Sequence, residues 1–448
     1  MRAPRTREQL RTSLAEDWPL WLLGGALFVV CLGTVYKFAK EPLFISMDSA
    51  LFQHAGWYIT QGAMPYTDIW DIKPPLIYGV TTLLALASGG NMVVLHLLSI
   101  ATAVLVVSAG VALVGLLTHR LTGDGWASLV AAGAMFTIPT LYMYPYAGIR
   151  PKYFAFACVA GSLVLAVDER YGWAGALAAA AAGFWQLGLP TTGVVVAMAA
   201  VRGGRGSAAR AVGGGLVVAV LTVAPFVLTG NGIPLYLEAV VVPMYGVDRY
   251  TMVGRLYEIV VELGYGLAVI PLGLYGLVAA VQRDRRYWWV LLGAGLYLLG
   301  FRFEMGGAID AMLLYAFLAV GIGAFVASLD SPERRRLVGG VVAAAVVLSL
   351  AWSFGPVTPV KDAIEDSYEQ DDIYDDIPER PGGVPETETI YWEKQRPATC
   401  NYHFSKKQIH FEYLTDGLQT RSDCGTWPFD RDPLEWTLDA LWPLSVGR

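Results

Sequence analysis

The residues WPLWLLGGALFVVCLGTVYKF (18–38) form the first apolar run of the chain, and a loop rich in aromatic and acidic residues (39–74) follows them. A transmembrane helix needs about 20 mostly apolar residues, so this run is long enough to cross a bilayer. Leu51, Ala55 and Tyr58 recur at helical spacing, which indicates an amphipathic helix at the membrane surface. The start of the fold is therefore a membrane span followed by an interfacial helix.

Further apolar runs continue along the chain to residue 354. They cover residues 91–118, 126–146, 152–168, 208–230, 264–281, 287–301, 306–328 and 337–354. Two other stretches are ambiguous: 75–90 is barely long enough for a span, and 171–201 is too long for one and contains Gly188-Leu189-Pro190. Either interpretation gives about eleven spans. The sequence predicts an all-α polytopic membrane protein whose transmembrane domain extends over 18–354.

Composition excludes several other classes. Of the 448 residues, 55% are hydrophobic and only 16% are charged, which excludes an ordinary soluble protein and disorder over most of the length. From Gly355 to the end there are 9 basic and 19 acidic residues, which gives this tail a net charge of −10. Because the whole chain has a formal net charge of −6, residues 1–354 carry +4. Without a basic patch, nucleic-acid binding is not expected, and the lipid bilayer is the expected partner.

Short basic loops predict the orientation, because Lys and Arg are retained on the cytoplasmic side. Arginines cluster in residues 1–17, 202–210, 283–286 and 334–336, which places the N-terminus in the cytoplasm. The loop 39–74, the loop 231–263, the turn 301–306 and the tail then lie outside. We divide the tail into an acidic linker (355–390) and a small extracytoplasmic region (391–448).

The side on which Arg150 and Lys152 lie depends on the two ambiguous stretches. If 75–90 crosses and 171–201 is one helix, both cations lie inside. If 75–90 only dips into the outer interface and 171–201 is two short helices, both lie outside.

The first outer loop carries the groups best suited to chemistry. Asp48 stands at the start of the interfacial helix, where it is either a helix cap or a general base. Further along, the loop reads GAMPYTDIWDIKPPLIY (62–78), with Asp68, Asp71 and Lys73 close together. Prolines at a helix start and a snorkelling Lys explain part of this stretch, but not three charges within six residues.

An Asp after the first span, then Gly-x-x-Pro-Tyr and Trp-Asp-x-Lys-Pro-Pro-Leu before the next apolar run, resembles the GT-C superfamily of polytopic glycosyltransferases. The motif is confined to 47–78, and the resemblance in layout extends over roughly 15–330. Within the superfamily, the chain is most similar to dolichyl-phosphate-mannose mannosyltransferases, and also to protein O-mannosyltransferases and aminoarabinose transferases. The resemblance implies a GT-C-like helix arrangement.

The resemblance also implies roles for individual residues. Asp48 matches the catalytic base of the family, and Lys73 matches the Lys-Pro residue near the lipid phosphate. A later motif that usually contains an acid reads Gly-Ile-Arg150-Pro-Lys152 here, which casts doubt on a metal shared by two acids. We therefore expect neither a metal nor another cofactor, with Arg150 and Lys152 binding the donor phosphate or serving only as interfacial cations.

Other residues in outer segments complete the candidate site. Arg302 could bind phosphate or pair with Glu304, and the loop 231–263 resembles a lid over the donor site. The candidate substrate-binding residues are His54, Tyr66, Asp68, Asp71, Tyr245 and Arg249. Cys400 and Cys424 lie in the external tail, where a disulfide, two free thiols or a zinc site are the alternatives, in that order.

The resemblance implies a hexosyltransferase that moves mannose from dolichyl or polyprenyl phosphate to a lipid-linked or protein-linked glycan on the outer face. Single displacement would invert the anomeric configuration, and the acidic tail suggests an archaeal cell-surface glycan. A transporter or flippase for lipid-linked sugars is the main alternative, and a membrane scaffold is the next. A transporter predicts charge along the spans, where only Asp310 and His96 are found.

Overall fold

The computed structural model describes residues 18–366, apart from 70, 242, 244–251 and 301–306. Within these residues the secondary structure is helical, and the only β contact is an isolated bridge between Pro65 and Ile69. The prediction of an all-α fold is therefore confirmed. The main helices are α2 Trp18–Lys40, α3 Met47–Thr60, α4 Leu76–Ala87, α5 Met92–Thr122, α6 Gly125–Met135, α7 Thr140–Met143, α8 Pro151–Val167, α9 Tyr171–Phe184, α10 Leu189–Leu228, α11 Gly232–Tyr236, α13 Met252–Leu263, α14 Val269–Arg283, α15 Trp288–Gly300, α16 Met312–Ala327, α17 Pro332–Phe354 and α18 Thr358–Asp366.

Six helical segments in the described part of the chain are long and apolar enough to cross a membrane. They are Trp18–Lys40, Met92–Thr122, Gln186–Leu228, Leu256–Arg283, Ala308–Ala327 and Pro332–Phe354. Other apolar helices, such as Pro151–Val167, are shorter. A polytopic membrane protein is supported, while the number of eleven spans stays a prediction.

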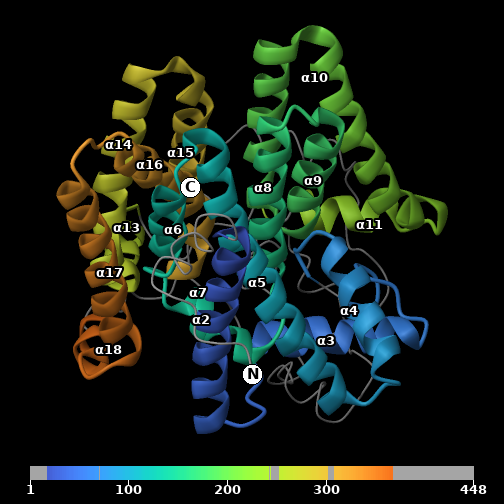
Figure 1. Ribbon diagram of the computed structural model, residues 1–448. Helices are drawn as coiled ribbons and strands as arrows, with labels where there is room; N and C mark the ends of the chain where they lie inside the picture. Colours follow the sequence, from blue (N-terminus) through green and yellow to red (C-terminus); the bar gives the residue numbers. More distant parts are fainter. Residues whose placement is uncertain (1–17, 70, 242, 244–251, 301–306, 367–448) are drawn as a thin grey trace, which may run out of the picture.

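In the two ambiguous stretches the structure shows short helices, as the second interpretation expects, while their depth in the membrane stays a prediction. Residues 75–90 contain only the short helix α4, which packs against α3 at the lower end of the bundle in Figure 1. Residues 171–201 divide into α9 and the first part of α10, separated by the extended Trp185 and a 3₁₀ turn, Gln186–Gly188. Pro190, which has no N–H, sits in the first turn of α10, where none is needed.

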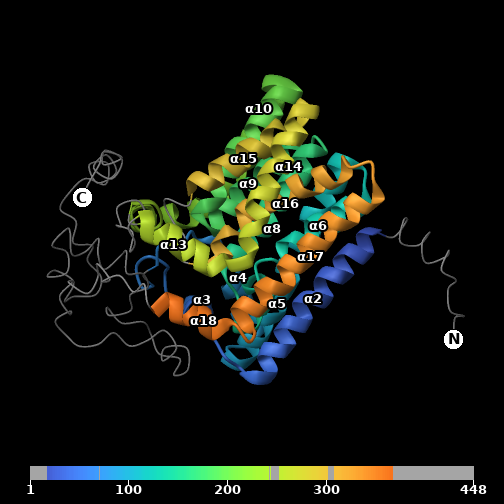
Figure 2. The same ribbon diagram turned by 90° about the vertical axis from the view of Figure 1, so that its left-hand side faces the viewer.

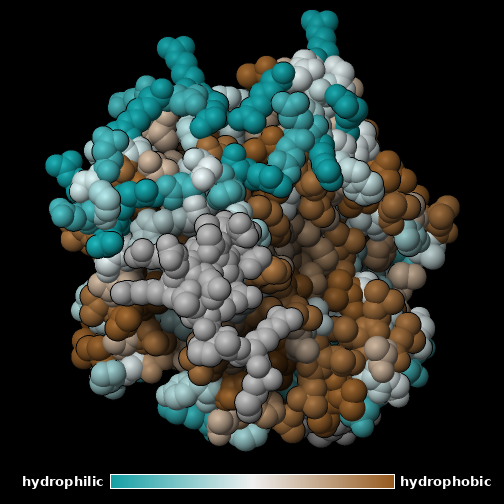
Figure 3. Space-filling model, in the orientation of Figure 1, coloured by the Kyte–Doolittle hydropathy of each residue, from teal (hydrophilic) through white to brown (hydrophobic). Residues whose placement is uncertain are grey.

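Helix α10 is two helices joined at a kink rather than one long span. Gly204 has φ +72° and ψ −171°, which breaks the helical path, and the two halves form the peak at the top of Figure 1. Arg202, Arg205 and Arg210 lie on either side of this kink. In Figure 3 hydrophilic residues gather along the same upper edge, and apolar residues dominate below it.

The core is centred on α16. Residues Met312–Ala324 are all buried, and α16 contacts α5, α6, α14 and α15. Figure 2 shows it lying among α14, α15 and α6. A helix that is apolar on every side is expected to be surrounded by other helices.

Two segments differ from their expected form. α3 was predicted to be amphipathic at the interface, but every residue from Ser49 to Gly56 is buried, so this part of α3 is enclosed by protein. The predicted linker 355–390 begins with α18, which packs against α13 and α17. Residues 367–448, including Cys400 and Cys424, lie outside the described residues.

Candidate active site

The carboxylate of Asp48 is open to solvent at the start of α3. The cap of this helix is Ser46, whose Oγ accepts a hydrogen bond of 3.3 Å from the backbone N–H of Ser49. Asp48 is therefore not the N-cap, and its side chain is 60% exposed. Because its carboxylate does not cap the helix, Asp48 remains available to bind a ligand.

Arg150 faces Asp48 across the site. Its Nη2 lies 4.0 Å from Asp48 Oδ2, and its guanidinium lies 5.2 Å from the centre of the Tyr144 ring. Burial lowers the pKa of Arg150, but the charge of Asp48, followed by smaller contributions from nearby tyrosines and Asp310, raises it by more. The guanidinium therefore stays charged, and this contact brings Asp48 and Arg150 to the same side of the bundle.

The close approach of the two residues depends on Gly148. Gly148 has φ +103°, and a Cβ there would lie 2.2 Å from Ser49 Oγ. The backbone N–H of Ser46 also bonds the Ala147 carbonyl at 3.3 Å, so the turn before α8 rests directly on the start of α3. Pro151 then begins α8 and leaves Arg150 as its extended N-cap residue.

Lys152 is the second residue of α8 and is paired with a residue that the sequence-based site prediction omitted. Its Nζ forms an ion pair with Asp310 Oδ1 and lies 5.2 Å from the centre of the Trp185 ring. Asp310 is in the short turn η6 Ala308–Ala311, just before α16. The presence of an acid in a largely apolar span was the signal that could have identified it.

Two donors near Asp48 lack hydrogen-bond partners within the described residues. They are the Nε of Arg150 and the hydroxyl of Tyr153, both buried. Tyr153 is close enough to Arg150 and Asp48 to interact with both electrostatically. Buried donors without partners are costly, so they are suited to an oxygen supplied by a bound substrate.

A second group of predicted residues surrounds the loop before α4. The Tyr66 hydroxyl donates to the Lys73 carbonyl at 2.7 Å, and the Tyr78 hydroxyl donates to Asp71 Oδ2 at 2.7 Å. Tyr66 and Asp71 are buried. These contacts fix the backbone on which Lys73 is carried.

The remaining predicted residues have local roles or lie outside the described part. Asp68 Oδ2 accepts a 2.7 Å hydrogen bond from the Met64 N–H, which closes a turn. His54 is buried in α3 beside the rings of Trp57 and Tyr58. Tyr245, Arg249 and Arg302 fall on residues that are not described. Among the described residues, no group of three or more His, Cys, Asp or Glu side chains could hold a metal ion.

Asp71 provides a test of this loop through pH. Burial raises the pKa of Asp71 to about 6, against the opposing effects of Lys73 and the Tyr78 hydrogen bond. Since the pKa of an aspartate in an unfolded chain is about 3.9, the folded state holds the proton more tightly. The stability gained from this protonation is fully present below the unfolded-state pKa and is lost as the pH rises through the folded-state pKa of about 6.

We therefore expect Asp71→Asn, which is neutral throughout, to lose less thermal stability than wild type between about pH 4.5 and pH 7. Thermal unfolding of the detergent-purified proteins measures this difference. Equal losses in the two proteins would contradict the protonation of Asp71 in the fold.

Comparisons with known proteins show what this chain is similar to. The DolP-mannose mannosyltransferase family matches residues 62–224. A dolichol phosphate-mannose mannosyltransferase of Haloferax volcanii is 27% identical over 420 residues, covering 85% of this chain and 91% of that protein. ArnT from Cupriavidus metallidurans, in a crystal structure with undecaprenyl phosphate bound, shares the fold with a TM-score of 0.58 and 14% identity over 88% of both chains. The predicted resemblance to GT-C enzymes and the assignment as a glycosyltransferase are therefore confirmed.

Proposed function

We propose that this GT-C-like glycosyltransferase transfers mannose from dolichyl or polyprenyl phosphate to a hydroxyl of a lipid-linked or protein-linked glycan at the outer face of the membrane. The observation that carries the proposal is the exposed Asp48 carboxylate beside the Arg150 guanidinium, 4.0 Å away. The family match and the Haloferax volcanii relative support mannose as the sugar.

Asp48 acts as the general base. The acceptor hydroxyl must lose a proton as its oxygen attacks the anomeric carbon, and a carboxylate within hydrogen-bonding distance can accept it. The solvent-exposed position of Asp48 leaves room for an acceptor that arrives from outside the membrane. Because one displacement breaks the bond between the sugar and the phosphate, the product has the inverted anomeric configuration.

Cationic and hydroxyl donors stabilise the departing phosphate. A phosphodiester leaving group is weakly basic, so it needs positive charge rather than a proton. Lys152 and Arg150 carry that charge on the same side of the bundle as Asp48, and Lys73 carries it on the loop before α4. The hydroxyl of Tyr153 adds a neutral donor. We propose that this set makes the reaction independent of a divalent metal.

The proposed orientation places Asp48 outside. The arginines around Gly204 lie at the opposite end of the bundle from α3 and α4, as the positive-inside rule requires. The N-terminus is then cytoplasmic and the acidic tail extracytoplasmic. An archaeal cell-surface glycan is the acceptor class that we propose, consistent with the Haloferax volcanii relative.

Transfer of labelled sugar tests this function. Membranes containing the protein are incubated with dolichyl-phosphate mannose, dolichyl-phosphate glucose or GDP-mannose, each labelled in the sugar, and with cell-surface glycan as acceptor. We expect transfer from dolichyl-phosphate mannose alone, unchanged by EDTA and with inversion at the anomeric carbon. Transfer from GDP-mannose, or labelled donor that moves between leaflets without transfer, would overturn the proposal.

A further inference from the structure

A continuous series of polar contacts connects α18, after the last apolar run, to Lys152 in the candidate site. Lys361 of α18 forms a 3.1 Å ion pair with Glu262 Oε1 of α13. The other oxygen of Glu262, Oε2, accepts a 3.3 Å hydrogen bond from the backbone N–H of Ala308 in η6. The same turn carries Asp310, which pairs with Lys152.

The inner end of this series determines where the ammonium of Lys152 lies. Asp310 is only 3% exposed, and the Lys152 side chain is 16% exposed, so both charges are largely removed from water. A lysine ammonium has three donors, and the Asp310 carboxylate binds it from one side. The remaining donors can then bind an anion without any change in the position of the ammonium.

The outer end of the series fixes the turn that carries Asp310. Glu262 and Lys361 are both mostly buried at the contact between α13 and α18. The Trp352 Nε1 also donates to the Val261 carbonyl at 2.7 Å, and the Tyr257 hydroxyl donates to the Ile364 carbonyl at 3.2 Å. α13 is therefore tied to both α17 and α18, and through Glu262 to η6.

We infer that Asp310 is a positioning residue that holds Lys152 where the donor phosphate binds, and that Glu262 and Lys361 hold Asp310 in place. The inference rests on the proposed function, because the phosphate is that of the donor lipid. It makes the described beginning of the C-terminal tail part of the donor-binding machinery. A lysine released from Asp310 loses its buried counter-charge and its fixed direction, both of which a preorganised phosphate site requires.

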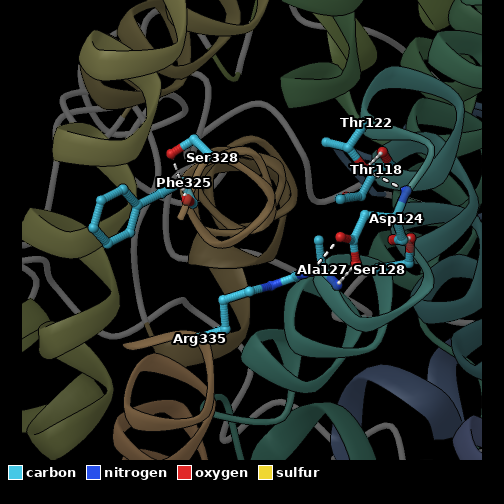
Figure 4. A network of polar contacts seen from close by, with 8 residues as sticks. All are labelled: Thr118, Thr122, Asp124, Ala127, Ser128, Phe325, Ser328 and Arg335. Carbon is cyan, nitrogen blue, oxygen red and sulfur yellow. Dashed lines mark hydrogen bonds and ion pairs between the residues drawn. The ribbon is translucent and has the colours of Figure 1, made fainter. Parts of the chain in front are cut away.

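The chain offers a matched control at the other end of the bundle. Asp124 caps α6 and forms an ion pair with Arg335 of α17, and Figure 4 shows this pair within a local network. The side chains of Arg335 and Asp124 are 25% and 23% exposed, so this pair is mostly buried, though less so than Lys152 (16%) and Asp310 (3%). Asp124 follows the far end of α5, roughly 40 Å from His96, whose ring contacts Gln53 of α3. Loss of this ion pair therefore measures the general cost of breaking an interhelical pair.

The experiment measures binding of dolichyl phosphate, which lacks the sugar, to the purified full-length protein, together with donor KM and kcat. We expect Asp310→Asn to weaken dolichyl-phosphate binding and raise donor KM by about tenfold or more, because its lysine is left unpaired. Asp310→Glu should recover part of the affinity, and Asp124→Asn should leave both quantities within about twofold of wild type. We expect kcat to change less than KM in Asp310→Asn.

Glu262→Gln and Lys361→Ala extend the test along the series. Each leaves the ion pair between Lys152 and Asp310 in place, so we expect dolichyl-phosphate binding to weaken and donor KM to rise by only about two- to fivefold. Lys361→Arg should remain close to wild type. Wild-type affinity in folded Asp310→Asn and Asp310→Glu, or equal losses in Asp124→Asn, would overturn the inference. Wild-type protein that binds dolichyl phosphate but transfers no mannose would instead overturn the proposed function alone.

Discussion

We expect the Asp48→Asn variant to transfer mannose about 10²–10⁴-fold more slowly than wild type while still binding the donor. Asparagine has almost the same shape as aspartate but cannot accept the proton of the acceptor hydroxyl. Ser46 caps α3, so the change removes no capping interaction from the helix. The loss should therefore fall on kcat, with donor KM close to the wild-type value.

Measurement of initial rates over a range of donor concentrations separates these effects. Asp168→Asn is a suitable control, because Asp168 is a partly exposed aspartate paired with Arg120 and belongs to neither group of candidate site residues. We expect this control to retain wild-type rates. An Asp48→Asn variant that inserts normally and works at the wild-type rate would eliminate Asp48 as the base.

The second large effect is expected for Gly148→Ala. An alanine Cβ would lie 2.2 Å from Ser49 Oγ and 2.9 Å from Gln53 Nε2, and the φ of +103° is unfavourable for any residue with a Cβ. The turn must then move away from α3 and carry Arg150 away from Asp48. A misplacement of about 1 Å can cost about 10²-fold in rate, so we expect a loss of that order.

The Gly123→Ala variant separates the effect of backbone strain from the effect of moving the turn that carries Arg150. Gly123 also has a positive φ, +71°, but a Cβ there meets nothing within 4 Å. We expect both variants to unfold at lower temperature, and only Gly148→Ala to lose activity per folded molecule. Comparable specific activities in the two variants would show that the contact between Gly148 and Ser49 does not position the site.

Much of the architecture could be read from local sequence. The length of apolar runs such as 18–38 and 337–354 predicted α2 and α17, because a bilayer imposes a minimum length on each span. Helical spacing predicted α3 with Asp48 at its beginning, and the apolar run 152–168 predicted α8. These features depend on residues only a few positions apart.

The course of the short segments could not be predicted in the same way. A stretch such as 75–90 is at the limit of spanning length, so packing decides its depth, and here α4 packs against α3. Whether Asp48 caps α3 was also open, because aspartate is a good capping residue, and the backbone geometry instead makes Ser46 the cap.

The sequence by itself indicated a polytopic membrane protein whose few charged residues lie mostly outside the apolar runs, because hydrocarbon excludes charge and short loops retain arginine. Only the tertiary structure decided which of these groups meet. Lys152 and Asp310 are 158 positions apart, and Glu262 and Lys361 are 99 apart. Such pairs form because helices from distant parts of the chain pack side by side, and no local pattern of residues encodes that packing.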